Sequence, residues 1–247
     1  MTLDRLRREW ETLGETDPFW AILTTPDKKG NRWTLEEFLQ TGRDEIAELM
    51  ARIEQLSVPS HRRSALDFGC GAGRLTQPLA EFFDTVVGVD ISTSMLALAE
   101  RLNRHGSRCR YVANTVGNLA IFESGTFDLI YTRLVLQHLP PRFERAYLSE
   151  LLRVLAPGGL LAFQLPSGEP APVVGGGFKA VLPLRFVQLI RRLRSRLAGR
   201  AALDTYGLHP NEVRQIVSSS GADVIDMVPD PCHGAETPGF RYFVTRR

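Results

Sequence analysis

The sequence lacks the features that mark secreted, membrane-spanning or metal-clustered proteins. Its three cysteines, Cys70, Cys109 and Cys232, form no CxxC pair, so neither a disulfide framework nor a zinc cluster is expected. No apolar run approaches the roughly 20 residues that cross a membrane, and the amino terminus lacks the charged-then-apolar order of a signal peptide. We therefore predict a cytoplasmic protein with no transmembrane segment and no metal.

Strong net charge is also missing. The chain has 30 basic and 28 acidic residues, a net charge of +2, and lysine occurs only at Lys28, Lys29 and Lys179. Because nucleic-acid binding usually needs an extended basic surface, nucleic acid is not an expected partner. A content of 43% hydrophobic and 23% charged residues over 247 positions is typical of one globular α/β domain with a modest cap or lid.

The first 57 residues have apolar positions at helical spacing and predict a helical N-terminal cap. Thr34 and Glu37 have the spacing of a capping box that opens a helix. From Ser64 onward, short apolar runs bounded by glycines alternate with helical stretches, the pattern of parallel strands joined by helices. Strands are predicted at 64–68, 85–90, 109–113, 127–132, 159–165, 224–228 and 240–244. Helices are predicted at 73–83, 93–104, 142–155 and 210–219.

The segment 167–208 is longer than an ordinary connection, and such insertions usually carry a lid or a binding surface. It has no acidic residue from Pro170 to Leu203 and includes a basic amphipathic helix near 185–200. Such a helix either packs on the core as a lid or lies on an anionic membrane surface. The chain thus divides into the cap at 1–57 and an α/β domain at 58–247 with this insertion.

The densest motif joins a strand to a helix through a glycine-rich loop. After the apolar strand come Asp67, then Gly69, Gly71 and Gly73 at alternate positions. Glycine is needed where a β-carbon would block a ligand or forbid the turn. The next strand ends at Asp90, where a carboxylate can hold both hydroxyls of a ribose. Dinucleotide sites use GxGxxG, but Arg74 stands at the third glycine position, so the loop indicates a nucleoside without a diphosphate.

Four segments in order resemble the class I S-adenosylmethionine-dependent methyltransferases of the small-molecule type. They are Leu66-Asp67-Phe68-Gly69-Cys70-Gly71-Ala72-Gly73, Val87-Gly88-Val89-Asp90-Ile91-Ser92, the region 127–139, and Leu152-Arg153-Val154-Leu155-Ala156-Pro157-Gly158-Gly159. The resemblance implies a Rossmann-like, doubly wound α/β fold with a mostly parallel seven-stranded sheet, and S-adenosyl-L-methionine as the cofactor.

The resemblance also implies roles for individual residues. Gly69, Gly71 and Gly73 would contact the donor, Asp90 its ribose, and Ile91 and Met95 its adenine. Asn114 stands where the family often has Asp, and an Asn carbonyl can accept the same hydrogen bond from the adenine amino group. The further members of the predicted cofactor-binding set are Asp67, Arg74, Asn118, Leu119 and Arg133. Arg74 has two possible roles: a salt bridge to the carboxylate of the methyl donor, or an exposed arginine in the first turn of the helix.

The predicted reaction is methyl transfer by in-line displacement to a hydroxyl of a small molecule, a sugar or a secondary metabolite. The protein must then align the acceptor and exclude water. His138, just past the fourth strand, and His209, after the insertion, are the candidate bases that remove the hydroxyl proton. The alternative for His138 is a packing role, and for His209 a helix cap. Arg133 and Gln137 are also candidates for the acceptor pocket.

Four other hypotheses stay open at this point. They are a small-molecule N-methyltransferase, a methyltransferase for a lipid-linked acceptor with peripheral membrane contact, a nicotinamide-dependent oxidoreductase, and a non-catalytic donor-binding module. The same sequence fits a monomer or a homodimer.

Overall fold

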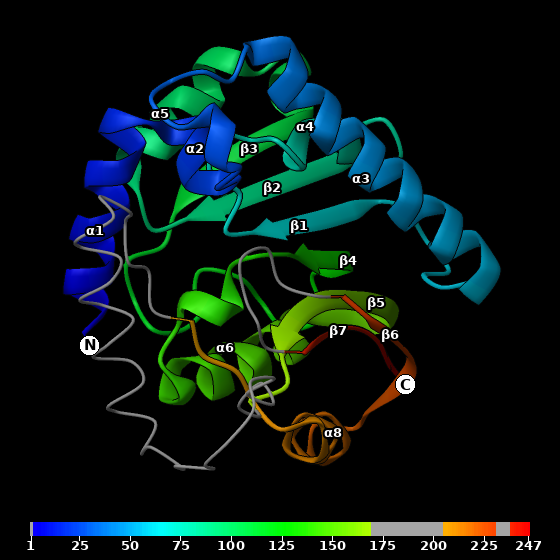
Figure 1. The fold of residues 1–247 in the computed structure, drawn as a ribbon. Helices are drawn as coiled ribbons and strands as arrows, with labels where there is room; N and C mark the ends of the chain where they lie inside the picture. The colour runs from blue at the N-terminus through cyan, green and yellow to red at the C-terminus, as the bar shows by residue number, and fades with distance from the viewer. Residues whose placement is uncertain (1, 169–204, 231–237) are drawn as a thin grey trace, which may run out of the picture.

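A seven-stranded sheet organises the computed structural model, which describes residues 2–168, 205–230 and 238–247 (Figure 1). The strand order is β3-β2-β1-β4-β5-β7-β6. β7 runs antiparallel to both neighbours, and the other adjacent pairs are parallel. The strands are β1 (Ser64–Phe68), β2 (Thr85–Asp90), β3 (Cys109–Ala113), β4 (Phe127–Thr132), β5 (Leu155–Pro166), β6 (Ala222–Pro229) and β7 (Gly239–Arg246). The predicted mostly parallel α/β sheet is confirmed.

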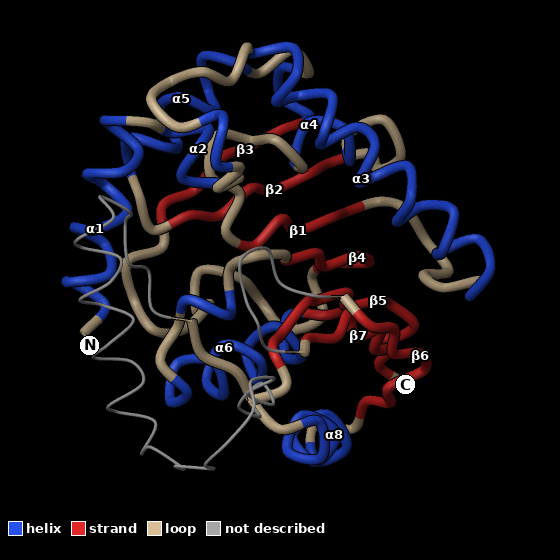
Figure 2. Tube along the Cα trace, viewed as in Figure 1, coloured by secondary structure: helices blue, strands red, loops and turns tan. Residues whose placement is uncertain are grey.

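The central strands are apolar on both faces because helices cover both (Figure 2). All six residues of β4 are buried. The first four strands have the predicted bounds, but β5 begins four residues before the predicted start at 159. The reason is an irregularity in its pairing with β4, where Leu155 faces Phe127 and Leu160 faces Leu129.

Helices pack against both faces of the sheet. α3 (Leu35–Leu56) and α4 (Thr76–Leu79) share one hydrophobic cluster with the sheet, and α6 (Pro141–Val154) and α8 (Pro210–Ser219) share the other. The predicted helix 73–83 is reduced to the four residues of α4. Gly73 has a φ of 78°, outside the helical region, and Pro78 removes a backbone donor.

The N-terminal segment forms α1 (Leu3–Thr16), α2 (Pro18–Ile22), a short 3₁₀ turn at Pro26–Lys28, and α3. α3 opens with the predicted capping box, because Thr34 and Glu37 exchange side-chain to backbone hydrogen bonds. Its residues Ile46, Leu49 and Ile53 are at most 2% exposed and pack with sheet residues. α3 is therefore a layer of the α/β core, whereas α1 packs beside α5 (Thr93–Leu102).

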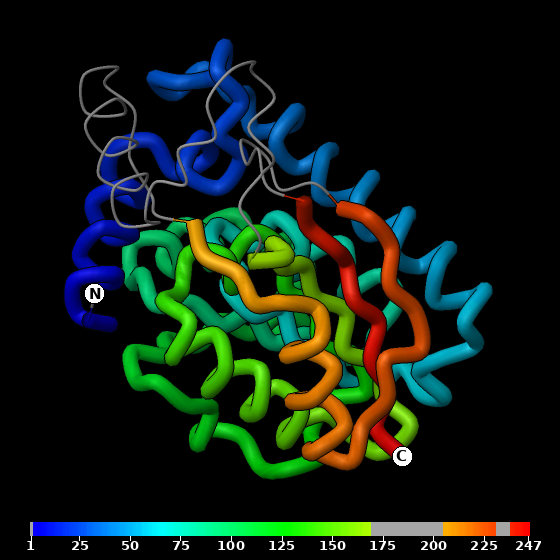
Figure 3. Tube along the Cα trace, turned by 60° about the horizontal axis from the view of Figure 1, so that its bottom comes forward, coloured from blue at the N-terminus to red at the C-terminus, as the bar shows by residue number. Residues whose placement is uncertain are grey.

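The C-terminal segments α8, β6 and β7 lie beside one another, coloured orange to red in Figure 3. β7 pairs with β5 and so joins these segments to the parallel part of the sheet. The predicted helix at 210–219 and the last two strands are present, the strands being longer than predicted. Most of the predicted lid at 167–208, with its basic helix at 185–200, lies outside the described residues. Within the described ranges, no helix has the length and apolar character of a membrane span.

One buried carboxyl group in α6 predicts a pH-dependent stability. Glu144 is 1% exposed, and neither of its carboxylate oxygens has a hydrogen-bond partner within the described part of the chain. Burial raises the pKa of Glu144 to about 8, with Arg145 opposing and Glu212 adding to this shift. Because the folded pKa exceeds the unfolded one, the free energy of unfolding should fall as pH rises from about 5 to about 8.

The Glu144→Gln variant should reduce that fall, because its side chain cannot ionise. Urea denaturation at pH 5 and pH 8 measures the free energy of unfolding of this variant and of the wild-type protein. The exposed Glu123→Gln is the matched control. An unchanged dependence on pH in Glu144→Gln would show that this carboxyl does not resist ionisation in the folded protein.

Candidate active site

A cavity of about 510 Å³ lies at the carboxyl ends of β1, β2 and β4, where open α/β sheets place their ligands. Its volume is in the range of small-molecule sites. The residues that follow these strands form one wall, and α1 and α2 supply the opposite side. Residues of the N-terminal side include Leu3, Leu6, Trp10, Trp20, Ala21 and Ile22.

The glycine loop borders this cavity with bare backbone. Gly69 has a φ of 79° and Gly71 a φ of 52°, a region that disfavours residues with a side chain. A β-carbon at Gly69 would lie 2.3 Å from the side chain of Val135, and one at Gly71 would lie 2.7 Å from that of Ile22. Glycine is therefore favoured by conformation at both positions and by space at Gly69, and the loop can approach a ligand closely.

Asp90 ends β2 and faces the same cavity. Its Oδ2 accepts from the Gly71 N–H at 2.8 Å, and its Oδ1 accepts from the Ser92 N–H at 2.9 Å. Burial raises the pKa of Asp90, while these two backbone donors act to lower it. A carboxylate has about four acceptor sites, so two remain for the hydroxyls of a ribose. The contacts also fix the carboxylate against the glycine loop.

Asn114, which follows β3, fits the adenine end of the predicted donor. Its Nδ2 donates to the Asn118 carbonyl at 2.9 Å, whereas its Oδ1 is buried and has no partner among the described residues. The side chain lies in the cavity wall. A buried acceptor without a donor is costly, so a ligand amino group at this point would relieve the cost. Asp90, Asn114 and the glycine loop therefore fit a nucleoside.

α1 is fastened to the start of α5, close to Asp90. Glu11 accepts from the N–H of Thr93 at 2.9 Å and from that of Ser94 at 3.0 Å. Burial acts to raise the pKa of Glu11, but these and side-chain hydrogen bonds outweigh it and hold the pKa below its usual value. A carboxylate at a helix N-terminus is favourable. This contact places Trp10 over the cavity.

His138 contributes its ring to the wall on the side of β4. The ring lies 5.5 Å from that of Trp10 in an edge-on arrangement, and its Nε2 is 3.1 Å from the Gln137 Nε2. Because an amide nitrogen only donates, this contact fits the neutral ring with its lone pair at Nε2. Such a ring can take a proton only at Nε2, in exchange for the hydrogen bond from Gln137.

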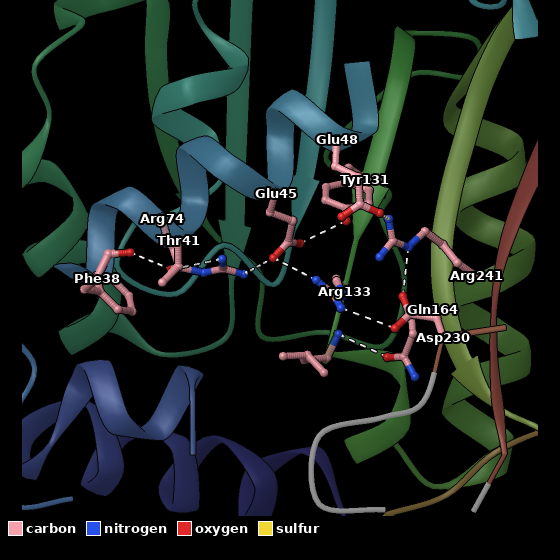
Figure 4. Close-up of polar contacts among 11 residues, drawn as sticks. Phe38, Thr41, Glu45, Glu48, Arg74, Tyr131, Arg133, Gln164, Asp230 and Arg241 are labelled. Carbon is pink, nitrogen blue, oxygen red and sulfur yellow. Dashed lines mark hydrogen bonds and ion pairs between the residues drawn. The ribbon is translucent and has the colours of Figure 1, made fainter. Parts of the chain in front are cut away.

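A chain of alternating charges extends from the cavity wall, where Arg74 and Arg133 lie, into the interior (Figure 4). Glu45 of α3 pairs with Arg74 at 2.8 Å and with Arg133 at 3.0 Å. Arg133 pairs in turn with Asp230 at 3.2 Å, and Asp230 with Arg241 at 2.8 Å. We call these five residues the arginine network. Burial acts to raise the pKa of Glu45, but the two arginines outweigh it and hold the pKa below its usual value.

The predicted site residues separate into two groups. Those in the cavity wall are Gly69, Gly71, Arg74, Asp90, Ile91, Met95, Asn114, Arg133 and His138. Those outside it are Asp67, Gly73, Asn118, Leu119 and His209.

Local contacts account for the second group. Asp67 lies behind the glycine loop and accepts from the Thr76 hydroxyl at 2.6 Å, and its burial raises its pKa to about 7. The N–H of Leu119 donates to Glu150, and the exposed Asn118 accepts from the following backbone. His209 is exposed and its Nδ1 caps α8, so the structure favours the capping role over the catalytic one.

Four residues at or beside the cavity are absent from the predicted site: Trp10 and Trp20 in the wall, and Glu45 and Asp230, which pair with the wall residue Arg133. Trp10 and Trp20 carry a signal, because aromatic groups in the N-terminal cap are candidates for covering a donor. Glu45 also carries a sequence signal, because it lies four residues before Leu49 and so shares the apolar face of α3, where a charged residue is unusual. Asp230 has no signal of its own. Among the residues that the structure describes, no three His, Cys, Asp or Glu side chains group as a metal site.

Comparisons with known proteins show what the chain is similar to. Residues 66–163 match the family model described as a methyltransferase domain. The trans-aconitate 2-methyltransferase of Variovorax paradoxus is 38% identical over 128 residues, 51% of this chain and 45% of that protein. The ubiquinone biosynthesis O-methyltransferase of Bordetella avium is 27% identical over 183 residues, 68% of this chain and 75% of that protein.

Among solved structures, the magnesium protoporphyrin IX methyltransferase from Synechocystis PCC 6803 with bound SAH has a TM-score of 0.64. It shares 16% sequence identity, and the match covers 99% of each chain. This likeness concerns the fold. The chain spans less than half the length of the trans-aconitate relatives that it matches.

Proposed function

We propose that this chain, whose residues 66–163 form a methyltransferase domain of the class I S-adenosylmethionine-dependent type, methylates an oxygen atom of a small molecule. The observation that carries the proposal is one cavity that joins a nucleoside cradle, at Asp90 and Asn114, to a histidine and a tryptophan. The relatives named for trans-aconitate and for ubiquinone biosynthesis support a small-molecule acceptor.

The residues of the wall fit S-adenosyl-L-methionine. Asp90 would hold the ribose, Asn114 the adenine amino group, and Ile91 and Met95 the flat faces of the adenine. Gly69 and Gly71 would bring their backbone against the amino acid end. The cofactor, when bound, supplies a methyl group on a positively charged sulfur, which is already a good electrophile.

The protein must therefore chiefly align the acceptor and keep water out. Trp10 and Trp20 contribute apolar surface to the cavity wall, which would restrict the access of water to the methyl group. Positioning of two reactants in a closed site supplies several kcal/mol of rate acceleration. His138 would take the proton of an acceptor hydroxyl as the new bond to carbon forms.

Calorimetric titration with S-adenosyl-L-methionine, S-adenosylhomocysteine and NADH tests the cofactor assignment. The two sulfur nucleosides should bind, and NADH should not. Tight NADH binding without any response to S-adenosyl-L-methionine would overturn the proposal in favour of an oxidoreductase.

Removal of the His138 ring tests the acceptor chemistry. The His138→Ala variant should lower kcat by about 10²–10⁴-fold if the acceptor is a hydroxyl, because a positioned base contributes about that factor. The measurement is transfer of a labelled methyl group to the acceptor, with the exposed His61→Ala as the matched control. Near-normal turnover in His138→Ala would instead favour an acceptor that needs no such base, either the amine of the N-methyltransferase alternative or a carboxylate oxygen.

A further inference from the structure

The cavity wall carries more positive than negative charge. Its described residues include Lys29, Arg74 and Arg133, against a single carboxylate, Asp90. Asp90 holds the glycine loop and faces the ribose position, so it belongs to the donor end. The part of the wall that remains for the acceptor is cationic, and a cationic pocket favours an anionic ligand.

The arginine network is itself unbalanced. It contains three guanidinium groups and two carboxylates, Glu45 and Asp230, whose side chains are 7% and 8% exposed. Glu48 pairs with Arg241 at 3.0 Å, but its side chain is 68% exposed, so water screens it. An excess of buried positive charge is costly and is offset when an anion binds beside it.

Arg133 is the member of the network that a ligand can reach. Its side chain is 20% exposed, compared with 4% for Arg74 and 7% for Arg241. Glu45 and Asp230 hold its two terminal nitrogens, and its Nε is buried without a partner in the described part of the chain. A guanidinium has five N–H donors in a rigid fork, so several stay available for an oxygen ligand.

The neighbouring backbone and side chains support a built site at this point. Leu134 has a φ of 61°, a strained conformation for a bulky residue, and its N–H faces the Gln164 Oε1 at 3.4 Å. Such strain persists where the surroundings dictate it and clusters at ligand sites. Gln137 is 4% exposed, and its Oε1 is an acceptor with no partner among the described residues. It could accept from a ligand hydroxyl.

We propose that the acceptor is a small carboxylic acid and that Arg133 binds its carboxylate. This inference rests on the proposed function, since it assigns the acceptor of that same cavity. It gives Arg133 a different role from the cofactor contact expected from the sequence: Arg133 determines the choice of acceptor, and the glycine loop with Asp90 holds the donor.

Two matched pairs of compounds test the proposal. They are 3,4-dihydroxybenzoate with 3,4-dihydroxybenzamide, and trans-aconitate with its triamide. Each is titrated calorimetrically into the wild-type protein saturated with S-adenosylhomocysteine. Methyl transfer from S-adenosyl-L-methionine is measured for the first pair, in which the acid and the amide carry the same two hydroxyls. At least one acid should bind and exceed its amide by about 10–100-fold, the factor expected for hydrogen bonds to a charged group.

Three variants separate recognition from structure. Arg133→Gln should abolish the preference for the acid, Arg133→Lys should restore part of it, and Arg43→Gln, at an exposed ion pair of α3, should leave it unchanged. A merely structural Arg133 would lower the thermal midpoint without changing the ratio of acid to amide. That unchanged ratio would overturn the proposal.

Two further results would also overturn it. One is the absence of binding by either acid at millimolar concentration, and the other is a loss of S-adenosylhomocysteine affinity in Arg133→Gln, which would place the donor's own carboxylate at Arg133. Failure of the wild-type protein to bind S-adenosylhomocysteine at all would instead refute the proposed function.

Discussion

The Asp90→Ala variant is expected to bind S-adenosyl-L-methionine at least about 100-fold more weakly than the wild-type protein. Two hydrogen bonds from ribose hydroxyls to a carboxylate would be lost, each contributing about 1.5–3 kcal/mol. The backbone N–H groups of Gly71 and Ser92 would lose their acceptor as well, so the glycine loop would lose its fixed position. Calorimetric titration measures the dissociation constant directly.

Asp84→Ala is the matched control, because Asp84 is exposed and immediately precedes the other end of β2. Asp84→Ala removes the same type of side chain at the end of β2 that lies away from the cavity. The affinity for S-adenosyl-L-methionine should therefore stay unchanged. Asp90→Asn keeps one carbonyl acceptor and should fall between the two. Equal affinities in Asp90→Ala and the wild-type protein would mean that the ribose lies elsewhere.

The Glu45→Gln variant is expected to show the largest loss of stability, about 3–5 kcal/mol. Breaking a buried ion pair costs this much because the partners stay buried without compensation. Glu45 holds two guanidinium groups and also accepts from the Tyr131 hydroxyl at 2.9 Å. For a domain of this size, the thermal midpoint should fall by about 10 °C.

Glu48→Gln gives the comparison within the same helix. Glu48 lies one turn along α3 and pairs with Arg241, yet its side chain is 68% exposed. An exposed pair contributes about 0–1 kcal/mol, so its removal should barely move the midpoint. Scanning calorimetry of Glu45→Gln and Glu48→Gln measures the two thermal midpoints. Similar midpoints would show that loss of the buried carboxylate of Glu45 destabilises the protein no more than loss of the exposed one.

Much of the fold could be predicted because each central strand is a short apolar run with glycine or a charge at its end. β1, β2 and β4 have the predicted bounds for this reason, since Gly69, Asp90 and Arg133 stand at their carboxyl ends. α4 is shorter than its apolar spacing indicates, because Gly73 and Pro78 limit the helix locally. The start of β5 differs from the predicted one because Leu155 already pairs with Phe127 of β4, ahead of Gly158 and Gly159. This pairing depends on tertiary structure, which the local sequence pattern does not show.

The donor site was more accessible to sequence analysis than the acceptor site. Gly69, Gly71 and Asp90 lie within 22 positions of one another and follow a local pattern of strand, loop and helix. Glu45, Arg133 and Asp230 come from three distant segments, and only folding brings them together. A charged residue such as Glu45 on an apolar helical face indicates a buried partner, but the sequence does not identify that partner.

The span of the arginine network has a consequence for synthesis of the protein. Within the network, the ion pair from Arg133 to Asp230 joins residues 97 positions apart. Two further ion pairs of α3, from Glu48 to Arg241 and from Arg52 to Asp226, join residues 193 and 174 positions apart. A nascent chain on the ribosome that already contains the glycine loop and Asp90 has Glu45 but still lacks Asp230, the second carboxylate that pairs with Arg133. It also lacks Asp226 and Arg241, which pair with α3. The arginine network can therefore be completed only when the last strand has left the exit tunnel, and chains truncated before β7 would expose an incomplete network to proteases and chaperones.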